Sequence, residues 1–442
     1  MGIDCVDRPF ETHNFSSIVS LRNCRFIRPG ACRSALPCNI VYDIFYPKSW
    51  SCQPSKPNLL TPMYIFPFGV SALLLRNSSG RNIDRPRNRA APDVFKASAV
   101  KETQEGRFQM SDEVLLDQAE AETLAIRACR AAGAAQSTAR SLVDATLSAA
   151  LFGPATLGFP HMVDYLDSFR EGRINCDPTP SCERPFPAFF VADADRGIAQ
   201  LGFDLAFDDL AEAARTFGVA VFTQTNSYTA GELGYYVRRL AGEGLAGIAA
   251  TNANAMVVAK AGGPAVYSTN PMAFGFPLGE GSLPLIIDQA SSATAYVNIV
   301  AAAAEGRSIP EGWAVDETGM DTQDAARALA GALLPFGGRK GANVALMVEM
   351  LSAGLSGGPW SLDTPSFRSG SASPAVGLTI IAMMPGRPDD GLVERAHRQA
   401  ARLQQHGVFI PGVDGIEYPK SPSQSLKVPR AVFETIKQIA DA

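Results

Sequence analysis

The pattern of apolar and polar positions changes abruptly near Met110. Downstream of that residue, apolar side chains recur every three or four positions, as in amphipathic helices, and short apolar runs between them are typical of buried strands. We expect the first helix to follow an N-cap and acidic turn at Ser111–Glu113 and to end at Gly133. The other predicted helices cover residues 136–151, 159–169, 203–217, 231–243, 293–305, 343–351 and 390–405, and the predicted strands cover residues 188–193, 219–223, 245–251, 283–288 and 376–384.

Helices that alternate with short apolar strands are typical of an α/β domain. We expect this domain to span residues 110–442, with a helical part at 110–175, an α/β part at 176–385, and a C-terminal helix and tail at 386–442. No Gly-x-Gly-x-x-Gly sequence follows a predicted strand, and no Gly-x-x-x-x-Gly-Lys-Ser/Thr sequence occurs. The candidate ligand sites are therefore other polar or glycine-rich loops.

Residues 1–109 differ from the rest of the chain in pattern and charge. They mix Pro, Ser, Asn and Arg without sustained periodicity. Residues 1–100 carry 13 Lys and Arg against 6 Asp and Glu, whereas the remainder carries 26 against 38. We predict that residues 1–109 are a disordered extension or precede a natural start at Met110. An appended regulatory arm is the alternative.

The cysteines also concentrate at the start of the chain. Five of the eight are Cys5, Cys24, Cys32, Cys38 and Cys52. A zinc module usually contains a Cys-x-x-Cys pair, which is absent here, and His13 is the sole nearby histidine. We therefore expect no metal site, and a cysteine-based metal or redox module is the alternative. The few cysteines of the main body fit a reduced cytoplasm.

Charge and hydropathy argue against nucleic-acid and membrane proteins. The formal net charge of -5 gives no reason to expect a nucleic-acid partner. Met1–Asp7 is acidic and lacks the apolar core of a signal peptide. The apolar run Leu59–Leu75 is interrupted by two prolines and a glycine, and it is shorter than the roughly 20 residues that a spanning helix needs. We predict a cytoplasmic protein without a membrane segment.

Three loops are candidate ligand sites. Thr225–Gly231 lies between a predicted strand and a predicted helix, where free N–H groups favour an anion, although an ordinary N-cap explains the same residues. Ser268–Pro271 is by itself a polar turn. Leu333–Gly341 places three glycines beside Arg339 and Lys340, so that backbone and cations can approach a phosphate together. A tight loop with two solvated cations is the alternative for this third segment.

Taken in order, these segments resemble the malate/L-lactate dehydrogenase-like family, which also includes ureidoglycolate dehydrogenases and cyclic-imine carboxylate reductases. The matching segments are GELGYYVRRLAGEGLAGIA (Gly231–Ala249), TNANA (Thr251–Ala255), STNPMAFGFP (Ser268–Pro277), LIIDQASS (Leu285–Ser292), IPEGWAVDETGMDT (Ile309–Thr322) and LLPFGGRKG (Leu333–Gly341). The resemblance covers about residues 112–440. Several long motifs in register are far more specific than any one loop.

The resemblance implies a fold, a cofactor and a reaction. Members have an α/β fold distinct from the Rossmann type, are usually homodimers, and transfer hydride between NAD or NADP and a small 2-oxo acid, 2-hydroxy acid or cyclic imino acid. By resemblance, residues 176–385 hold cofactor and substrate, and Thr269 lies near the substrate. The residues that the resemblance places at the cofactor are Asn226, Ser227, Thr229, Asp288, Gly337, Gly338, Arg339 and Lys340.

The early helix departs from the family pattern. Relatives carry Ser-His-Gly, with an arginine one turn after the histidine. In relatives the histidine protonates the carbonyl or imine, and the arginine holds the substrate carboxylate. A gapless alignment puts Leu157 at the histidine position and His161 at the arginine position. On a continuous helix these two residues face the same side, so we predict that His161 transfers the proton. A packing or surface histidine is the alternative.

Two further departures concern the pocket. Thr229–Gly231 stands where relatives have His-Phe-Gly, and Tyr296–Asn298 stands where they have Arg-Gly-Lys. We therefore predict an NAD(P)-dependent oxidoreductase that acts on a small acid or imino acid through an altered pocket. The alternative is a non-catalytic family member that keeps the fold and acts as a binding or partner subunit.

Overall fold

The structure is a computed structural model that describes residues 112–387, 390–416 and 425–442 of the 442-residue chain. All of them belong to one compact unit, Lys96–Ala442. The predictions made for residues 1–109, including those for the cysteines and for the apolar run Leu59–Leu75, lie outside the described residues. In the described ranges, no helix is both long enough and apolar enough to cross a membrane.

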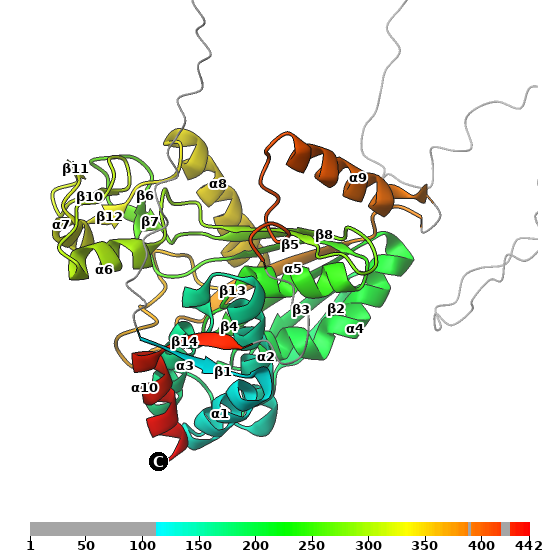
Figure 1. Cartoon of the computed structure of the whole chain (residues 1–442), viewed down its shortest axis with the longest axis horizontal. Helices are drawn as coiled ribbons and strands as arrows, with labels where there is room; N and C mark the ends of the chain where they lie inside the picture. Colours follow the sequence, from blue (N-terminus) through cyan, green and yellow to red (C-terminus); the bar gives the residue numbers. More distant parts are fainter. Residues whose placement is uncertain (1–111, 388–389, 417–424) are drawn as a thin grey trace, which may run out of the picture. The chain divides into compact units, whose positions relative to one another are not determined.

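A seven-stranded sheet runs through this unit (Figure 1). In spatial order its strands are β2 (Ser181–Phe186), β3 (Phe189–Asp193), β4 (Val219–Ser227), β13 (Val376–Met383), β5 (Ala246–Thr251), β8 (Met272–Phe276) and β9 (Leu285–Gln289). β3 and β4 run parallel, and the other neighbouring pairs of this sheet are antiparallel. A Rossmann sheet is mostly parallel, so the mixed sheet confirms the prediction of an α/β fold of another type.

Two helices, α4 (Ala199–Phe217) and α5 (Leu233–Gly242), pack on this sheet. Apolar residues recur every three or four positions along α4, and they are buried among the apolar side chains of β4 and β13. α5 lies very close to β8, because a Cβ atom at Gly275 would stand only 2.7 Å from the carbonyl oxygen of Val237. The packing of these two helices therefore holds the segment that connects β4 to α5 in a defined position.

The start of the described chain differs from the predicted helix with a cap at Ser111–Glu113. Residues Glu113–Leu116 form a strand, β1, which pairs antiparallel with β14 (Leu426–Pro429). The first helix, α1 (Gln118–Ala131), begins behind a capping box in which the Asp117 carboxylate accepts a backbone N–H at 2.7 Å. The prediction of a helix over these first residues is wrong, because the partner strand lies at the far end of the sequence, where no local pattern reveals it.

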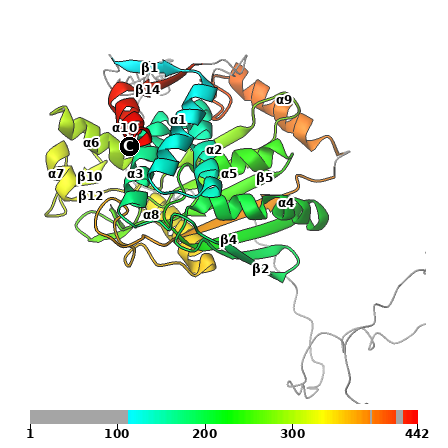
Figure 2. The same cartoon turned by 90° about the horizontal axis from the view of Figure 1, so that it is seen from below.

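Within residues 386–442, predicted as a helix and a tail, the part that the structure describes includes two α-helices and a strand. The first helix, α9 (Leu392–Gln405), confirms the predicted one. β14 and α10 (Arg430–Ala440) follow it, so the prediction of a tail is wrong. α10 buries Ile436 and Ile439 against the helical layer and lies beside α1 in both views (Figures 1 and 2).

The helical layer consists of α1, α2 (Gln136–Phe152), α3 (Phe159–Arg170) and α10, which share one apolar core. α2 also contacts α4 and α5, so this layer is joined to the sheet. The remaining predicted helices and strands are present, with ends that differ by a few residues.

A second sheet of five short strands was not predicted. In spatial order its strands are β11 (Asp321–Thr322), β10 (Ala314–Val315), β12 (Ala332–Leu333), β6 (Val257–Val258) and β7 (Ala265–Tyr267). The helices of this region are α6 (Tyr296–Ala304), α7 (Ala325–Ala330) and α8 (Arg339–Glu349), which continues into the π-helical turn η2 (Met350–Gly354). Strands of two or three residues are too short to show a periodic pattern, which is why sequence reasoning missed them.

Candidate active site

The strand register brings several predicted site residues to one end of the seven-stranded sheet. β13 begins opposite the end of β4, β8 begins opposite the end of β5, and β9 ends opposite the start of β8. The loops that leave or enter these strands therefore converge, although they are far apart in the sequence. The predicted residues at this end are Asn226, Ser227, Thr269 and Asp288.

Asn226 and Ser227 occupy the end of β4. The sequence had indicated a loop at the N-terminus of a helix, and for these two residues that prediction is wrong. Asn226 has a positive φ of 61°, and its side-chain amide donates to Asp193 Oδ1 at 3.0 Å. Ser227 is buried, and its hydroxyl accepts a hydrogen bond from Gln224 at 2.9 Å. Both side chains thus stabilise the end of the strand, and the proposed contact of either with a cofactor stays a prediction.

Thr229 connects this end of the sheet to α3. Its hydroxyl donates to the Tyr165 hydroxyl at 2.6 Å, and the Gln200 amide donates to the same oxygen at 3.4 Å. Burial raises the pKa of Tyr165 to about 12, so its hydroxyl stays protonated at neutral pH. The Tyr165 ring also meets the ring of His161 edge-on, with centroids 5.1 Å apart. The structure therefore brings Thr229 and His161 into contact with one buried tyrosine.

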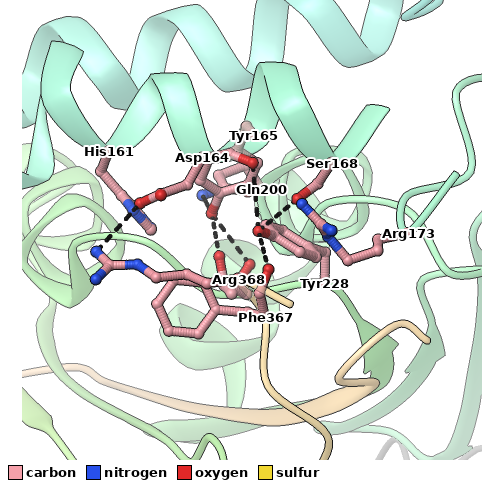
Figure 3. Close-up of polar contacts among 10 residues, drawn as sticks. His161, Asp164, Tyr165, Ser168, Arg173, Gln200, Tyr228, Phe367 and Arg368 are labelled. Carbon is pink, nitrogen blue, oxygen red and sulfur yellow. Dashed lines mark hydrogen bonds and ion pairs between the residues drawn. The ribbon is translucent and has the colours of Figure 1, made fainter. Parts of the chain in front are cut away.

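His161 forms a hydrogen-bonded pair with Asp164 (Figure 3). His161 Nδ1 lies 2.9 Å from Asp164 Oδ2, and the two side chains are only 13% and 25% exposed. Burial acts to raise the pKa of Asp164, but the hydrogen bond and charge of His161 and the charge of Arg368 outweigh it, so that this pKa lies below its ordinary value. The carboxylate is therefore ionised at neutral pH and fixes the orientation of the imidazole.

Leu157 and His161 do not share a helix face, so the prediction that placed them on one is wrong. Leu157 ends a short 3-10 helix (Ala155–Leu157), and α3 begins only at Phe159. Gly158 separates the two with φ -83° and ψ -124°, so Leu157 and His161 do not lie on one continuous helix. Gly158 packs closely on α2, since a Cβ atom there would lie 3.1 Å from the Ala150 side chain. His161 remains a candidate for proton transfer because it contacts Asp164 and Tyr165, and not because it shares a helix face with Leu157.

Asp288 is partly exposed and lies near the start of α5, close to other charged side chains. Its Oδ2 accepts the Gly234 N–H at 2.7 Å, as a capping carboxylate would. Glu232 and Arg238 form an ion pair nearby, with 2.7 Å between Oε1 and Nη2 and little exposure. Burial raises the pKa of Asp288 to about 6, and the Glu232 charge adds to this while the hydrogen bond from Gly234 opposes it. Its cofactor role stays a prediction, because the hydrogen bond described here joins its carboxylate to the start of α5.

The glycine-rich segment before α8 has the geometry of an anion site. Gly337 and Gly338 have positive φ values of 55° and 61°, and a Cβ atom at either would meet nothing within 4 Å. α8 begins at Arg339 and not at Asn343 as predicted, so Arg339 and Lys340 are exposed residues of its first turn. Helix N–H groups, open backbone and two cations at one place fit the diphosphate of a dinucleotide. These are the residues that would hold such a cofactor.

Thr269 is joined to α8 through a buried polar network. Its carbonyl accepts the Ser291 N–H at 2.7 Å, while the neighbouring Asn270 donates to Glu349 Oε2 at 2.7 Å. Glu349, which is 5% exposed, also accepts the Ser361 N–H and hydroxyl, each at 2.7 Å. Glu349 and Ser361 were missed by sequence reasoning, since a glutamate within a helix gives no sign that it is buried. The network fixes the position of the Thr269 loop relative to α8.

Two cavities of the described residues lie away from these groups. One of about 500 Å³ is lined by α1 and α10, and one of about 600 Å³ lies beside α9. No predicted site residue lines either of these two cavities. Within the part of the chain that the structure describes, no group of three or more His, Cys, Asp or Glu side chains is arranged to hold a metal.

Comparison with known proteins identifies the family. The family model described as malate/L-lactate dehydrogenase matches residues 116–432. The chain therefore belongs to the malate/L-lactate dehydrogenase family, and the class this defines is that of NAD(P)-dependent oxidoreductases. Both predictions from the sequence are confirmed at this level.

Individual relatives agree along nearly their whole length. The chain is 35% identical over 329 residues to the (2R)-3-sulfolactate dehydrogenase (NADP(+)) of Chromohalobacter salexigens, covering 73% of this chain and 96% of that protein. It is 30% identical over 335 residues to the Delta(1)-pyrroline-2-carboxylate reductase 1 of Burkholderia ambifaria, covering 74% and 98%.

Solved structures agree with the fold. The delta1-piperideine-2-carboxylate reductase of Pseudomonas syringae superposes with a TM-score of 0.69 at 30% identity, over 74% of this chain and 99% of that one. The malate dehydrogenase of Pyrococcus horikoshii gives a TM-score of 0.61 at 22% identity, over 74% and 95%, which supports the fold alone.

Proposed function

We propose that this protein transfers hydride between NAD(P) and a small 2-oxo or 2-hydroxy acid or a cyclic imino acid, with His161 as the proton-transfer residue. The observation that carries the proposal is the His161–Asp164 pair, which lies beside Tyr165 and Thr229 at the loop that follows β4. Relatives named for sulfolactate and pyrroline-2-carboxylate support this choice of substrates.

In the proposed mechanism one group of residues binds the cofactor and substrate, and another group transfers the proton. When bound, the nicotinamide supplies or accepts the hydride. Gly337–Lys340 would hold the cofactor phosphates, and Thr269 would contact the substrate. His161 Nδ1 is engaged by Asp164. Nε2 is therefore the nitrogen that can give a proton to the carbonyl oxygen or the imine nitrogen of the substrate. The ionised Asp164 stabilises the imidazolium and holds the ring.

The pocket is proposed to differ from those of malate and lactate dehydrogenases. Leu157 cannot carry a proton, and Tyr296–Asn298 replaces charged residues of relatives. In the structure the Asn298 amide donates to the Thr294 hydroxyl at 3.0 Å, so this position now contributes to the start of α6. We expect the absence of the arginine and lysine charges to shift the preferred substrate, because a contact that cannot form no longer contributes to binding of the transition state.

The assembly and location are part of the proposal. We expect a homodimer in the cytoplasm that acts on a small molecule and binds neither nucleic acid nor membrane. Sedimentation of the purified full chain gives the test of the dimer. A monomer that retains turnover would contradict it.

The deciding experiment uses the purified full chain. It is titrated with NADH and with NADPH while nicotinamide fluorescence is followed, and then mixed with 3-sulfopyruvate, pyruvate, Delta(1)-pyrroline-2-carboxylate and Delta(1)-piperideine-2-carboxylate. We expect tight binding of one cofactor and oxidation of it by at least one acid. Binding of neither cofactor to the folded protein would contradict the proposal.

The second candidate function is a non-catalytic family member, and the observation that favours it is Leu157 at the family histidine position. The same experiment separates the two. Cofactor binding with no turnover of any of these acids would favour the non-catalytic function.

A further inference from the structure

An arginine, Arg368, lies beside the His161–Asp164 pair and comes from a segment that no sequence pattern had selected. Its Nη2 lies 3.5 Å from Asp164 Oδ2, the oxygen that His161 also contacts (Figure 3). Arg368 precedes β13 in the sequence, about 200 residues after α3. One carboxylate oxygen thus lies next to two positively ionisable side chains that the fold brings together.

The backbone on both sides of Arg368 is fixed. The Tyr228 hydroxyl donates to the Phe367 carbonyl at 2.9 Å, and the Arg173 guanidinium donates to the Gly370 carbonyl at 3.0 Å. The Phe367 ring stands edge-on to the His161 ring with centroids 6.1 Å apart. The loop is therefore tied to the layer that carries His161, and it holds the start of the Arg368 side chain in place.

The far end of the Arg368 side chain is not fully engaged. Its side chain is 44% exposed, and within the described residues its recorded side-chain partners are Asp164 and the ring of Phe367, 5.1 Å away. A guanidinium has five N–H donors, so several are left for a ligand. The other arginine of this cluster, Arg173, is 3% exposed and already bonds Glu171, Ser168 and Gly370. Arg368 is thus the cation of this cluster that can meet a ligand.

We propose that Arg368 binds the carboxylate of the substrate, next to the proton carried by His161. With His161 protonated, the charges of His161, Asp164 and Arg368 sum to one positive charge, which balances one substrate carboxylate. A guanidinium and a carboxylate match in a planar two-point contact, which a lysine cannot reproduce. This inference rests on the proposed function and names the residue that selects 2-carboxylates.

The test compares two unreactive probes that differ only in charge, pyrrole-2-carboxylate and pyrrole-2-carboxamide. Each is titrated into the full chain with its bound nicotinamide cofactor, or into the chain alone if no cofactor binds. Arg368→Gln should weaken the carboxylate about 30-fold and leave the carboxamide unchanged, because a charge-assisted contact is lost. Arg368→Lys should recover part of the affinity. Arg170→Gln, at an exposed arginine near the end of α3, is the matched control and should change neither titration.

Several outcomes would overturn the inference. Equal carboxylate binding by Arg368→Gln and the wild type would do so, as would an equal loss of both probes together with a lower melting temperature, which indicates a structural role. The inference would also be overturned if the wild type did not bind pyrrole-2-carboxylate. A wild type that binds the carboxylate through Arg368 but oxidises no nicotinamide would contradict the proposed function alone.

Discussion

The α8 side of the site and the α3 side of the site relate differently to the family. The α8 side, defined here as Ser268–Asn270 with Gly337–Lys340, keeps its matching segments, and a buried network around Glu349 supports it. The α3 side, defined as His161, Asp164, Tyr165 and Thr229, is held by the hydrogen bonds of His161 with Asp164 and of Thr229 with Tyr165. The sequence predicts that this side lacks the histidine and arginine of the family. We expect Gly337–Lys340 of the α8 side to vary little among members that share a cofactor, and the surroundings of His161 on the α3 side to vary with the substrate.

The largest expected effect comes from removing the imidazole of the α3 side. His161→Ala should lower kcat/KM about 1000-fold on the acid that the wild type reduces, because general acid catalysis is lost. Cofactor affinity should not change. The measurement is steady-state kinetics beside a nicotinamide fluorescence titration, with His406→Ala, in an exposed histidine after α9, as the control. Unchanged turnover would remove His161 from the mechanism.

The next effect concerns Asp288, which lies on β9 and accepts a hydrogen bond from the start of α5. In the folded protein its pKa of about 6 lies above its ordinary value of 3.8, so its contribution to stability is full below pH 3.8 and is lost as pH rises through 6. Asp288→Asn removes this dependence. The unfolding free energy of the wild type relative to the variant should fall by about 3 kcal/mol over that range.

Urea unfolding at a series of pH values measures this difference. Asp208→Asn, at an exposed aspartate of α4, is the control. A wild type and Asp288→Asn variant with parallel pH profiles would show that Asp288 ionises normally. A large loss of cofactor affinity in the variant would instead assign Asp288 to the α8 side.

The smallest effect sharpens the α8 side. Lys340→Gln should raise the Kd of the preferred cofactor about tenfold, since one exposed charge contact to a phosphate is lost. kcat at saturating cofactor and the melting temperature should stay the same. Lys427→Gln, at an exposed residue of β14, is the matched control. A cofactor affinity unaltered by Lys340→Gln would mean that this lysine is merely solvated.

Much of the fold could be predicted because its central helices and strands show local periodicity. The helices at Gln136–Phe152 and Phe159–Arg170 and the buried strand at Val376–Met383 were all expected. β1 was taken for part of a helix, since four residues with a remote partner carry no period. The site was predicted only in part for the same reason.

His161 was selected on a helix face that Gly158 interrupts, yet its pairing with Asp164 keeps it as a candidate. Arg368 could not be found from the sequence, because it lies in a Ser- and Gly-rich stretch whose proximity to α3 depends on tertiary contacts. Residue spacing predicts neighbours within one element, whereas a site built from three loops requires the register of the whole sheet.

The pairing of β1 with β14 also governs how this protein is made. Strand β1 leaves the ribosome early, but its hydrogen-bonding partner and α10, which covers α1, are the last described elements to be synthesised. The helical layer must therefore wait, with the buried face of α1 exposed, while more than 300 residues are added. A premature stop before Leu426 would leave that face uncovered for the lifetime of the chain, and we expect such a product to be removed by proteolysis.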